Sequence, residues 1–292
     1  AVDLDGWQAG FEVNVPALAG GSIEPYLVRP ATEADLPFIA ECYDYGRRDL
    51  LLSTLRSAAE WRFELLGKDE GHVEYRVMRI ISAPDGEPLG FFSHLPYLDT
   101  GLLVCQMCEL KPGVSWMAVT PTIIRALWQA GQEIGQRTQK KCSNYAFMLR
   151  ENHPIYTVAA GQLPRRKEPY AWYLRVPDLK GFLGLIAPVL EQRLADSICV
   201  GHTGELLLSF YHSLLCLRFE QGRLAAIEER LRDTDPAPGA AFTGLSFLQL
   251  LSGYRSLAEL EYAAQDTWAR PPARVLLNIL FPKQHSNMLP VL

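Results

Sequence analysis

The clearest change in hydrophobic period along the chain falls within residues 114–137. Residues 114–119 form a short apolar run, and apolar side chains then recur every three or four positions as far as Ile134. Thr120 suits the N-cap of a helix, and Pro121 suits the first helical position, where a missing N–H costs nothing. The pattern therefore predicts a strand over 114–119 that runs directly into a helix starting after Thr120.

This junction lacks the features that bind a nucleotide-like cofactor. A pyrophosphate cradle needs several free backbone N–H groups, usually at glycines that let the main chain approach the anion closely. No glycine lies between Trp116 and Gly131, and Pro121 removes one donor. The sequence predicts that the junction does not hold a pyrophosphate.

The first part of the chain alternates strand and helix signals. Period-two stretches predict strands, and capped stretches with helical spacing predict helices. The predicted strands are 11–15, 26–30, 73–81, 90–98, 101–110, 143–149 and 169–176, and the predicted helices are 32–47, 58–66 and 153–160. Such an order predicts a mixed sheet with flanking helices.

The pattern changes at Pro177. Asp178 suits the cap of a helix with an apolar face, and three strands with tight turns then predict an antiparallel meander over 204–229. Further helices are predicted near 243–254, 256–263 and 272–280. The predicted fold class is α/β (α+β), with a connector over 1–24 and domains over 25–176 and 177–292.

Composition narrows the class of partner. The net charge is −5 without a block of like charges, which is not the footprint of a nucleic-acid-binding protein. No apolar run approaches about 18 residues, so no membrane span is predicted. The six cysteines lie in apolar surroundings, which is typical of reduced thiols in a cytoplasmic protein. We expect small molecules or further copies of the chain as partners.

Two patterns bear on metal binding. Cys105 and Cys108 form a single C-x-x-C, and residues three apart on a strand point to opposite faces. The six histidines include no i, i+4 pair. The sequence therefore predicts buried structural thiols and no metal site.

Two stretches of the first part resemble a known fold. They are "LVRPATEADLPFIAECY" at its start and "WMAVTPTIIRALWQAG" at its centre, and they resemble the GNAT N-acetyltransferases. In that family the segment after the central strand carries Q/R-x-x-G-x-G/A, whose amides hold the pyrophosphate of acetyl-CoA. Here "VTPTIIRAL" continues without those glycines. The resemblance implies a degenerate GNAT domain that kept the scaffold and lost the cofactor site.

Residues 178–292 resemble the sterol-carrier-type domain that ends one GNAT group, typified by the enhanced intracellular survival protein. The resemblance rests on "FTGLSFLQLLSGYRSLAELEY" and "VLLNILFPKQHSNMLPVL". Members of that group have an active first GNAT domain, an inactive second copy and this third domain. The resemblance implies that the chain is the C-terminal two-thirds of such an enzyme, and that residues 1–24 end its first domain. It also implies a homo-oligomer, and acetyl-CoA as the cofactor of the parent protein rather than of this chain.

The same resemblance implies one catalytic group in this chain. In the better-known members the terminal carboxylate enters the active site and helps to deprotonate the substrate amine. The matching group is the carboxylate of Leu292, whose pKa of roughly 3.5 makes it a weak base or an anion that orients an ammonium. The general-acid tyrosine and the CoA loop belong to the first domain.

Acidic and aromatic side chains supply the other candidates. Glu41 and Asp44, close in sequence to Asp49, suit a wall for an aminoglycoside or polyamine by charge complementarity, and the alternative is a solvated helix face. Tyr170 and Trp172 share one face of a predicted strand, where they line a substrate site or pack in the core.

Three functional hypotheses follow. In the first, the chain belongs to an acetyl-CoA-dependent N-acetyltransferase for amine substrates, shapes the acceptor cleft, mediates assembly and is inactive alone. In the second, it is a non-catalytic binding module that holds an apolar, lipid-like ligand near Phe242, Phe247 and Leu251. In the third, it is a structural oligomerisation unit.

Overall fold

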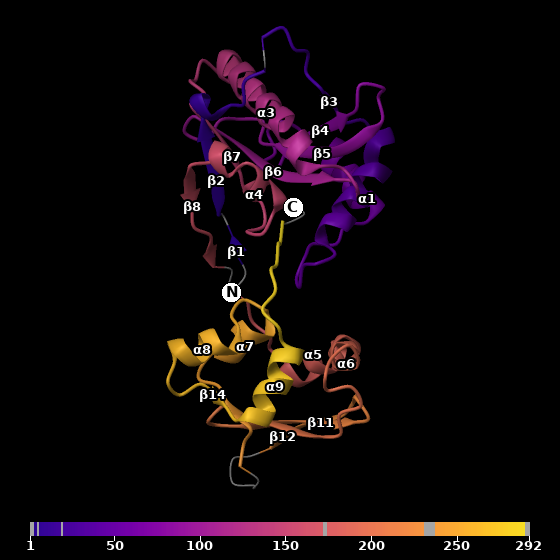
Figure 1. The fold of residues 1–292 in the computed structure, drawn as a ribbon, viewed down its shortest axis with the longest axis vertical. Coiled ribbons are helices and arrows are strands. Elements are labelled where there is room, and N and C mark those ends of the chain that lie inside the picture. The colour runs from indigo at the N-terminus through magenta and orange to yellow at the C-terminus, as the bar shows by residue number, and fades with distance from the viewer. Residues whose placement is uncertain (1–2, 5, 19, 172–173, 231–236, 290–292) are drawn as a thin grey trace. The chain divides into compact units, whose positions relative to one another are not determined.

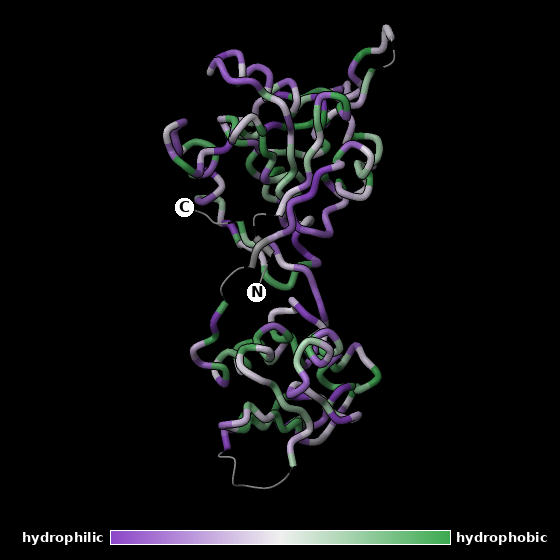
Figure 2. Tube along the Cα trace, turned by 90° about the vertical axis from the view of Figure 1, so that its left-hand side faces the viewer, coloured by the Kyte–Doolittle hydropathy of each residue, from purple (hydrophilic) through white to green (hydrophobic). Residues whose placement is uncertain are grey.

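The chain forms two compact units. The computed structural model describes residues 3–4, 6–18, 20–171, 174–230 and 237–289. The large unit comprises Asp3–Ala171 together with the chain from Asn287 onward, and the small unit lies between them in sequence and ends at Ser286. In each unit hydrophobic stretches of chain lie inside and hydrophilic stretches lie mostly at the periphery (Figure 2).

The described residues of the large unit form a seven-stranded mixed sheet with the order β3-β4-β5-β6-β7-β2-β8 (Figure 1). Only β6 and β7 pair in parallel among them. The strands are β2 (Trp7–Phe11), β3 (Leu27–Pro30), β4 (Val77–Ser82), β5 (Pro88–His94), β6 (Leu102–Leu110), β7 (Asn144–Phe147) and β8 (Arg165–Lys167). A separate two-stranded ribbon pairs β1 (Asp3–Leu4) with β9 (Tyr170–Ala171).

Helices cover both faces of this sheet. One hydrophobic cluster joins α3 (Trp116–Thr138) and α4 (Pro154–Val158) to one face, and a second joins α1 (Leu36–Arg47) and α2 (Ala58–Arg62) to the other. Short helical turns extend these elements at Glu12–Asn14, Glu33–Asp35, Phe63–Gly67 and Ala160–Gln162. The predicted mixed sheet with flanking helices is confirmed.

The start of α3 corrects the sequence prediction. The predicted strand over 114–119 does not form, because the helix already begins at Trp116 and Ser115 caps it by accepting a hydrogen bond from the Ala118 N–H at 3.3 Å. Pro121 lies inside the helix rather than at its first position. The strand that precedes α3 is β6, so the strand-to-helix junction spans residues 111–115 and contains Gly113 at φ 83°.

A β-bulge corrects the prediction for the C-x-x-C. In the β5–β6 pairing Ser93 faces Met107, whereas the next residue, His94, faces Cys105, so one residue of β6 is inserted. The insertion restores a shared face for Cys105 and Cys108, and both thiols lie in the cluster beneath α3. All six cysteines are free, and burial raises the pKa of the Cys108 thiol, which favours the predicted structural role.

Two other predicted strands differ from the structure. The strand expected at 11–15 lies instead at Trp7–Phe11, and the chain turns at Glu12–Asn14. In the described part of the strand expected at 169–176, Tyr170–Ala171 pair with Asp3–Leu4, and residues 174–176 are not in a strand. Residues 172–173 lie outside the described part.

The small unit packs helices on a five-stranded sheet with the order β12-β11-β10-β13-β14. Its strands are β10 (Gly204–Ser209), β11 (Leu214–Glu220), β12 (Arg223–Arg230), β13 (Ala240–Ala241) and β14 (Trp268–Ala269), and its helices are α5 (Leu179–Leu185), α6 (Ala187–Ala195), α7 (Ser246–Leu251), α8 (Leu257–Ala263) and α9 (Pro271–Leu280). The predicted antiparallel meander is confirmed in β10–β12, whereas β10 and β13 pair in parallel. Within the described ranges no helix has both the length and the apolar character needed to cross a bilayer.

The corrected helix start gives a test with two neighbouring side chains. Replacing Ser115 by alanine removes the cap and should lower the free energy of unfolding by about 1 kcal/mol. Replacing Thr120 by valine should leave stability unchanged or raise it, because the buried Thr120 hydroxyl has no hydrogen-bond partner among the described residues. Urea unfolding of both variants checks this. The reverse order of stabilities would mean that Thr120 is the cap.

Candidate functional site

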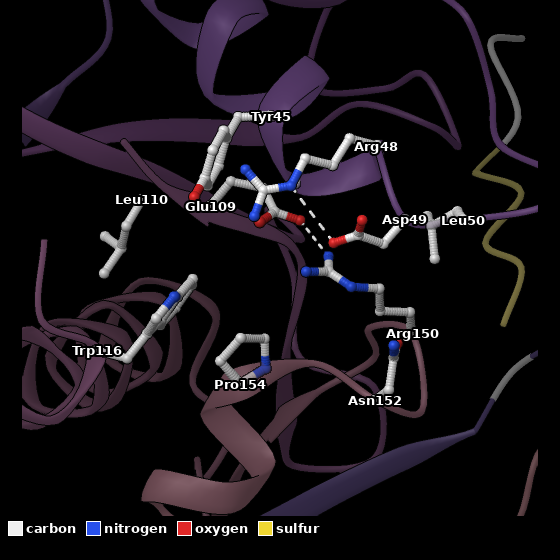
Figure 3. Close-up of a pocket in the computed structure, with 11 residues that line it drawn as sticks. Tyr45, Arg48, Asp49, Leu50, Glu109, Leu110, Trp116, Arg150, Asn152 and Pro154 are labelled. Atoms are coloured by element: carbon white, nitrogen blue, oxygen red, sulfur yellow. Dashed lines mark hydrogen bonds and ion pairs between the residues drawn. The ribbon is translucent and has the colours of Figure 1, made fainter. Parts of the chain in front are cut away.

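A pocket opens in the large unit where the two parallel strands separate. The pairing of β6 with β7 ends at Cys105 and Phe147, and the two segments then continue without pairing with each other. Side chains from the end of α1, the end of β6, the start of α3 and the segment after β7 line the opening (Figure 3). Its volume is ≈ 250 Å³. We call it the Glu109 pocket.

A buried ion pair occupies the base of this pocket. Glu109, at the end of β6, pairs with the Arg150 guanidinium, and both side chains are about one-tenth exposed. Gly46 of α1 lies so close that a Cβ there would stand 2.2 Å from the Glu109 carboxyl carbon. Any larger residue at position 46 would displace the carboxylate, so this glycine allows α1 to approach the pair.

Burial dominates the electrostatics of Glu109. Desolvation raises the pKa of its carboxyl group to about 7, although the neighbouring Arg150 charge opposes the shift. Glu109 therefore changes its protonation state near neutral pH, which is unusual for a carboxyl group and typical of groups that exchange protons in functional sites.

The His153 ring lies next to the ion pair and is neutral. Its Nδ1 accepts the Ile155 N–H at 3.2 Å and so caps α4, which leaves the proton on Nε2. Nε2 donates this proton to the Cys108 carbonyl at 2.7 Å, while the Glu109 carboxylate is 3.9 Å away. Burial lowers the pKa of His153 well below its usual value. The ring therefore serves as a neutral link between α4 and β6.

Charged groups also form the rim. Figure 3 shows Arg48 and Arg150 extending into the pocket from two different segments, with the Asp49 and Glu109 carboxylates beside them. The Arg48 guanidinium stacks on the Tyr45 ring at 3.7 Å and donates to Asp49 at 3.4 Å. The opening therefore presents alternating charges rather than a wall of one sign.

The structure places two of the predicted site residues, Glu41 and Asp44, apart from this pocket. Glu41 and Asp44 lie on the exposed face of α1 and do not line it, and Asp44 pairs with Arg47 at 2.7 Å. Asp49, the third residue of that acidic group, does line it. The backbone of Tyr170 pairs with Leu4, but its side chain, like Trp172 and Leu292, lies outside the described part of the chain.

The segment that leads to Leu292 is held firmly on the large unit. Asn287 forms a parallel bridge with Ser53, and its N–H donates to the Leu52 carbonyl at 2.9 Å. The Leu289 carbonyl accepts from Thr54 Oγ1 at 2.7 Å and from Arg56 Nη2 at 3.0 Å. The Leu289 side chain packs against the cluster beneath α1 and α2. We call these contacts the tail clamp.

Sequence reasoning missed the ion pair itself. Glu109 and Arg150 are 41 positions apart, and neither stands in a recognisable motif. One signal was present: Glu109 is a charged residue near the end of an otherwise apolar predicted strand, and charged residues are rarely buried unless they are paired. That signal indicates a partner without naming it.

The raised pKa of Glu109 predicts a specific pH dependence. Because the folded-state pKa of about 7 lies above the usual 4.5, the folded state binds the proton more tightly, and this stabilisation is lost as pH rises between those values. Unfolding of Glu109→Gln beside the parent chain should therefore show the variant gaining about 3 kcal/mol relative to the parent from pH 4.5 to pH 7. Glu41→Gln, on the exposed face of α1, is the control and should show no such gain. Equal pH profiles for parent and Glu109→Gln would contradict the raised pKa.

Solved structures show what this architecture is similar to. A GCN5-related N-acetyltransferase from Kribbella flavida matches at 17% identity and a TM-score of 0.55, over 98% of this chain and 65% of that one. One from Anabaena variabilis matches at 12% identity and 0.58, over 98% and 67%. Eis1 from Mycobacterium abscessus matches at 12% identity and 0.50, over 98% and 66%.

These matches concern structure rather than sequence. No family model matches the chain, and no curated protein matches it. The chain spans about two thirds of the length of the solved structures above. At such low identity the likeness establishes the fold, so the chain has the fold of GCN5-related N-acetyltransferases.

Proposed function

We propose that this chain is the part of an acetyl-CoA-dependent N-acetyltransferase that does not bind CoA, and that it helps to form the acceptor site for an amine substrate. The fold shared with N-acetyltransferases supports the reaction class. In this proposed division of labour, another part of the protein binds CoA. The observation behind it is the Glu109–Arg150 pair in the opening between β6 and β7.

The residues of that opening do not suit acetyl-CoA. Its ≈ 250 Å³ is below the about 300–1,000 Å³ of typical small-molecule sites, and the Arg150 guanidinium at its base is already paired with the Glu109 carboxylate. At the start of α3 the Ala118 N–H is already taken by the Ser115 cap. The sequence-based argument against a pyrophosphate site placed the strand-to-helix junction at Thr120. The pocket volume, the ion pair and the Ser115 cap take the place of that argument. We assign the cofactor to the remainder of the parent protein.

The tail clamp supports a role for the terminal carboxylate. Leu289 is fixed by two hydrogen bonds to its carbonyl and by packing of its side chain. Leu292 follows three residues later, so the clamp restricts where its carboxylate can reach. We propose that this carboxylate orients the substrate ammonium or accepts its proton through water.

The acceptor is a cationic amine, in the class of aminoglycosides or polyamines. The Glu41 carboxylate on the exposed face of α1 has no hydrogen bond or ion pair with the described residues, and with Asp44 it offers negative charge to such a substrate. Tyr170 and Trp172 complete the proposed lining. Assembly as a homo-oligomer in the cytoplasm belongs to the same proposal.

The small unit gives less support to the binding-module alternative. Phe242, Phe247 and Phe281 are buried and contact one another, with ring centroids 5.1 and 5.5 Å apart. Side chains that pack against one another in this way favour a filled core at the place where an apolar ligand was predicted. We therefore prefer the acetyltransferase.

An activity assay on three proteins tests the proposal. They are the chain as given, a form extended at its N-terminus with the preceding coding sequence, and that extended form without residues 289–292. Transfer of acetyl groups from acetyl-CoA to kanamycin and spermidine should require the extension. Activity should fall by roughly tenfold or more without the last residues, because the carboxylate that orients the amine is then lost.

A matched pair of variants in the extended form separates the clamp from general stability. Thr54→Val removes one hydrogen bond to the Leu289 carbonyl and should lower kcat, whereas Ser57→Ala, at the N-cap of α2, should lower stability alone. Full activity of the chain as given would contradict the proposed division, and full activity after tail deletion would contradict the role of the carboxylate.

A further inference from the structure

A second pocket of the large unit shares no lining residue with the Glu109 pocket. It lies between the C-terminal half of α3, strand β4 and the end of β5, and its volume is ≈ 280 Å³. Its charged and polar lining consists of Glu70, Tyr75, Arg79, His94, Glu133 and Arg137. We call it the His94 pocket. The proposed acetyl transfer uses none of these residues.

His94 carries an unsatisfied acceptor on the wall of this pocket. The side chain is buried, with 2% exposure, and its Nδ1 lies 2.8 Å from the Leu95 carbonyl. Because a carbonyl accepts, the proton is on Nδ1 and Nε2 carries a lone pair. Nε2 is buried and has no hydrogen-bond partner among the described residues. A buried acceptor without a donor is destabilising and is rare in proteins, so it points to a missing partner.

Near neutral pH the Nε2 atom of His94 is an acceptor, while Nδ1 donates to the Leu95 carbonyl. Burial lowers the pKa of His94 to about 4; the hydrogen bond to Leu95 opposes the shift, Arg79 adds to it and Glu133 opposes it. The charges of Arg79 and Glu133 are therefore both felt at the ring. The missing partner must be a hydrogen-bond donor, because neutral His94 offers only a lone pair at Nε2.

Charged side chains of both signs surround the ring and have few partners of their own. The Arg79 guanidinium forms no hydrogen bond or ion pair with any described residue, and the Glu133 carboxylate accepts from Gln129 Nε2 at 2.9 Å. Arg137 is held by long contacts, 3.7 Å to Glu70 and 3.4 Å to the Pro96 carbonyl. Two guanidinium groups and two carboxylates cancel, so the pocket suits a ligand that is neutral overall but carries both charges.

We propose that the His94 pocket binds a small zwitterion of the amino-acid class. Its ammonium donates to His94 Nε2 and to the Glu133 carboxylate, and its carboxylate pairs with Arg79. A simple cation leaves Arg79 unpaired, and a simple anion leaves the acceptor unsatisfied, so each gains only half of the interactions. Nε2 is covered in this structure, so the ligand reaches it only when neighbouring side chains move aside.

Calorimetric titration of the 292-residue chain tests this proposal directly. The proteinogenic amino acids are titrated one at a time, with acetate and methylammonium as probes that carry one charge each. At least one amino acid should bind with a Kd below about 1 mM, and each single-charge probe should bind roughly tenfold more weakly or worse.

Variants locate the site. Arg79→Gln should weaken binding by roughly tenfold, and Arg218→Gln in the small unit, an exposed arginine in a 3.6 Å ion pair, should change nothing. His94→Phe should abolish binding and also raise the melting temperature of the free chain, because it removes the unsatisfied acceptor from a position beside Phe92. Arg79→Gln keeps the test decisive if His94→Phe does not fold.

Two outcomes would overturn the proposal. One is the absence of heat with every amino acid up to roughly 10 mM. The other is binding that Arg79→Gln and His94→Phe leave unchanged, which would place the ligand elsewhere. Neither outcome bears on acetyl transfer, so the two proposals stand or fall separately.

Discussion

The separation of two parallel strands is the constraint on which the large unit depends. Strands β6 and β7 pair as far as Cys105 and Phe147 and then diverge, which leaves an opening in the middle of the sheet. In such an opening the backbone N–H and C=O groups lack strand partners. A ligand or side chains must bond to these groups and occupy the space. Here the Glu109–Arg150 pair occupies the base of the opening, and the neutral His153 ring connects the end of β6 to α4.

A buried ion pair at this position has consequences for chemistry. Desolvation opposes the charged form of Glu109, and the close approach of Arg150 offsets that cost in part. Gly46 allows α1 to close over the pair. The same opening is where a strand-to-helix junction would offer donors to a phosphate, so the pair and a pyrophosphate compete for one place. On the proposed division of labour, the chain keeps the fold of GCN5-related N-acetyltransferases and leaves the cofactor to the remainder of the parent protein.

Local sequence pattern predicted most elements but misjudged the most important junction. The helices at α1, α2, α4 and α7–α9 and the meander follow from caps and periodicity that act within a few residues. The one helix predicted after Asp178 is divided at Ile186 into α5 and α6. In the run 114–119, Val114, Trp116 and Val119 pack in the cluster beneath α3, whereas Met117 is exposed. A short apolar run looks alike in a strand and in a helix. Thr120 and Pro121 resemble a helix start, whereas α3 begins at Trp116 with Ser115 as its N-cap.

Long-range geometry explains what the sequence could not reveal. The bulge that brings Cys105 and Cys108 to one face depends on how β5 pairs with β6, and no local residue announces it. The Glu109–Arg150 pair, the tail clamp and the orphaned acceptor of His94 each join segments far apart in sequence or depend on tertiary burial. Candidate residues chosen by composition, such as Glu41 and Asp44, lie instead on an exposed helix face.

Whether the chain as given binds acetyl-CoA tests the proposed division of labour most directly. Calorimetric titration of acetyl-CoA into the 292-residue chain should produce no saturable heat, while the form extended at its N-terminus should bind. Saturable, micromolar binding by the chain itself would mean that the opening between β6 and β7 admits the cofactor despite Glu109 and Arg150. In that case the large unit would itself be a CoA-binding domain, and the proposed division of labour would be wrong.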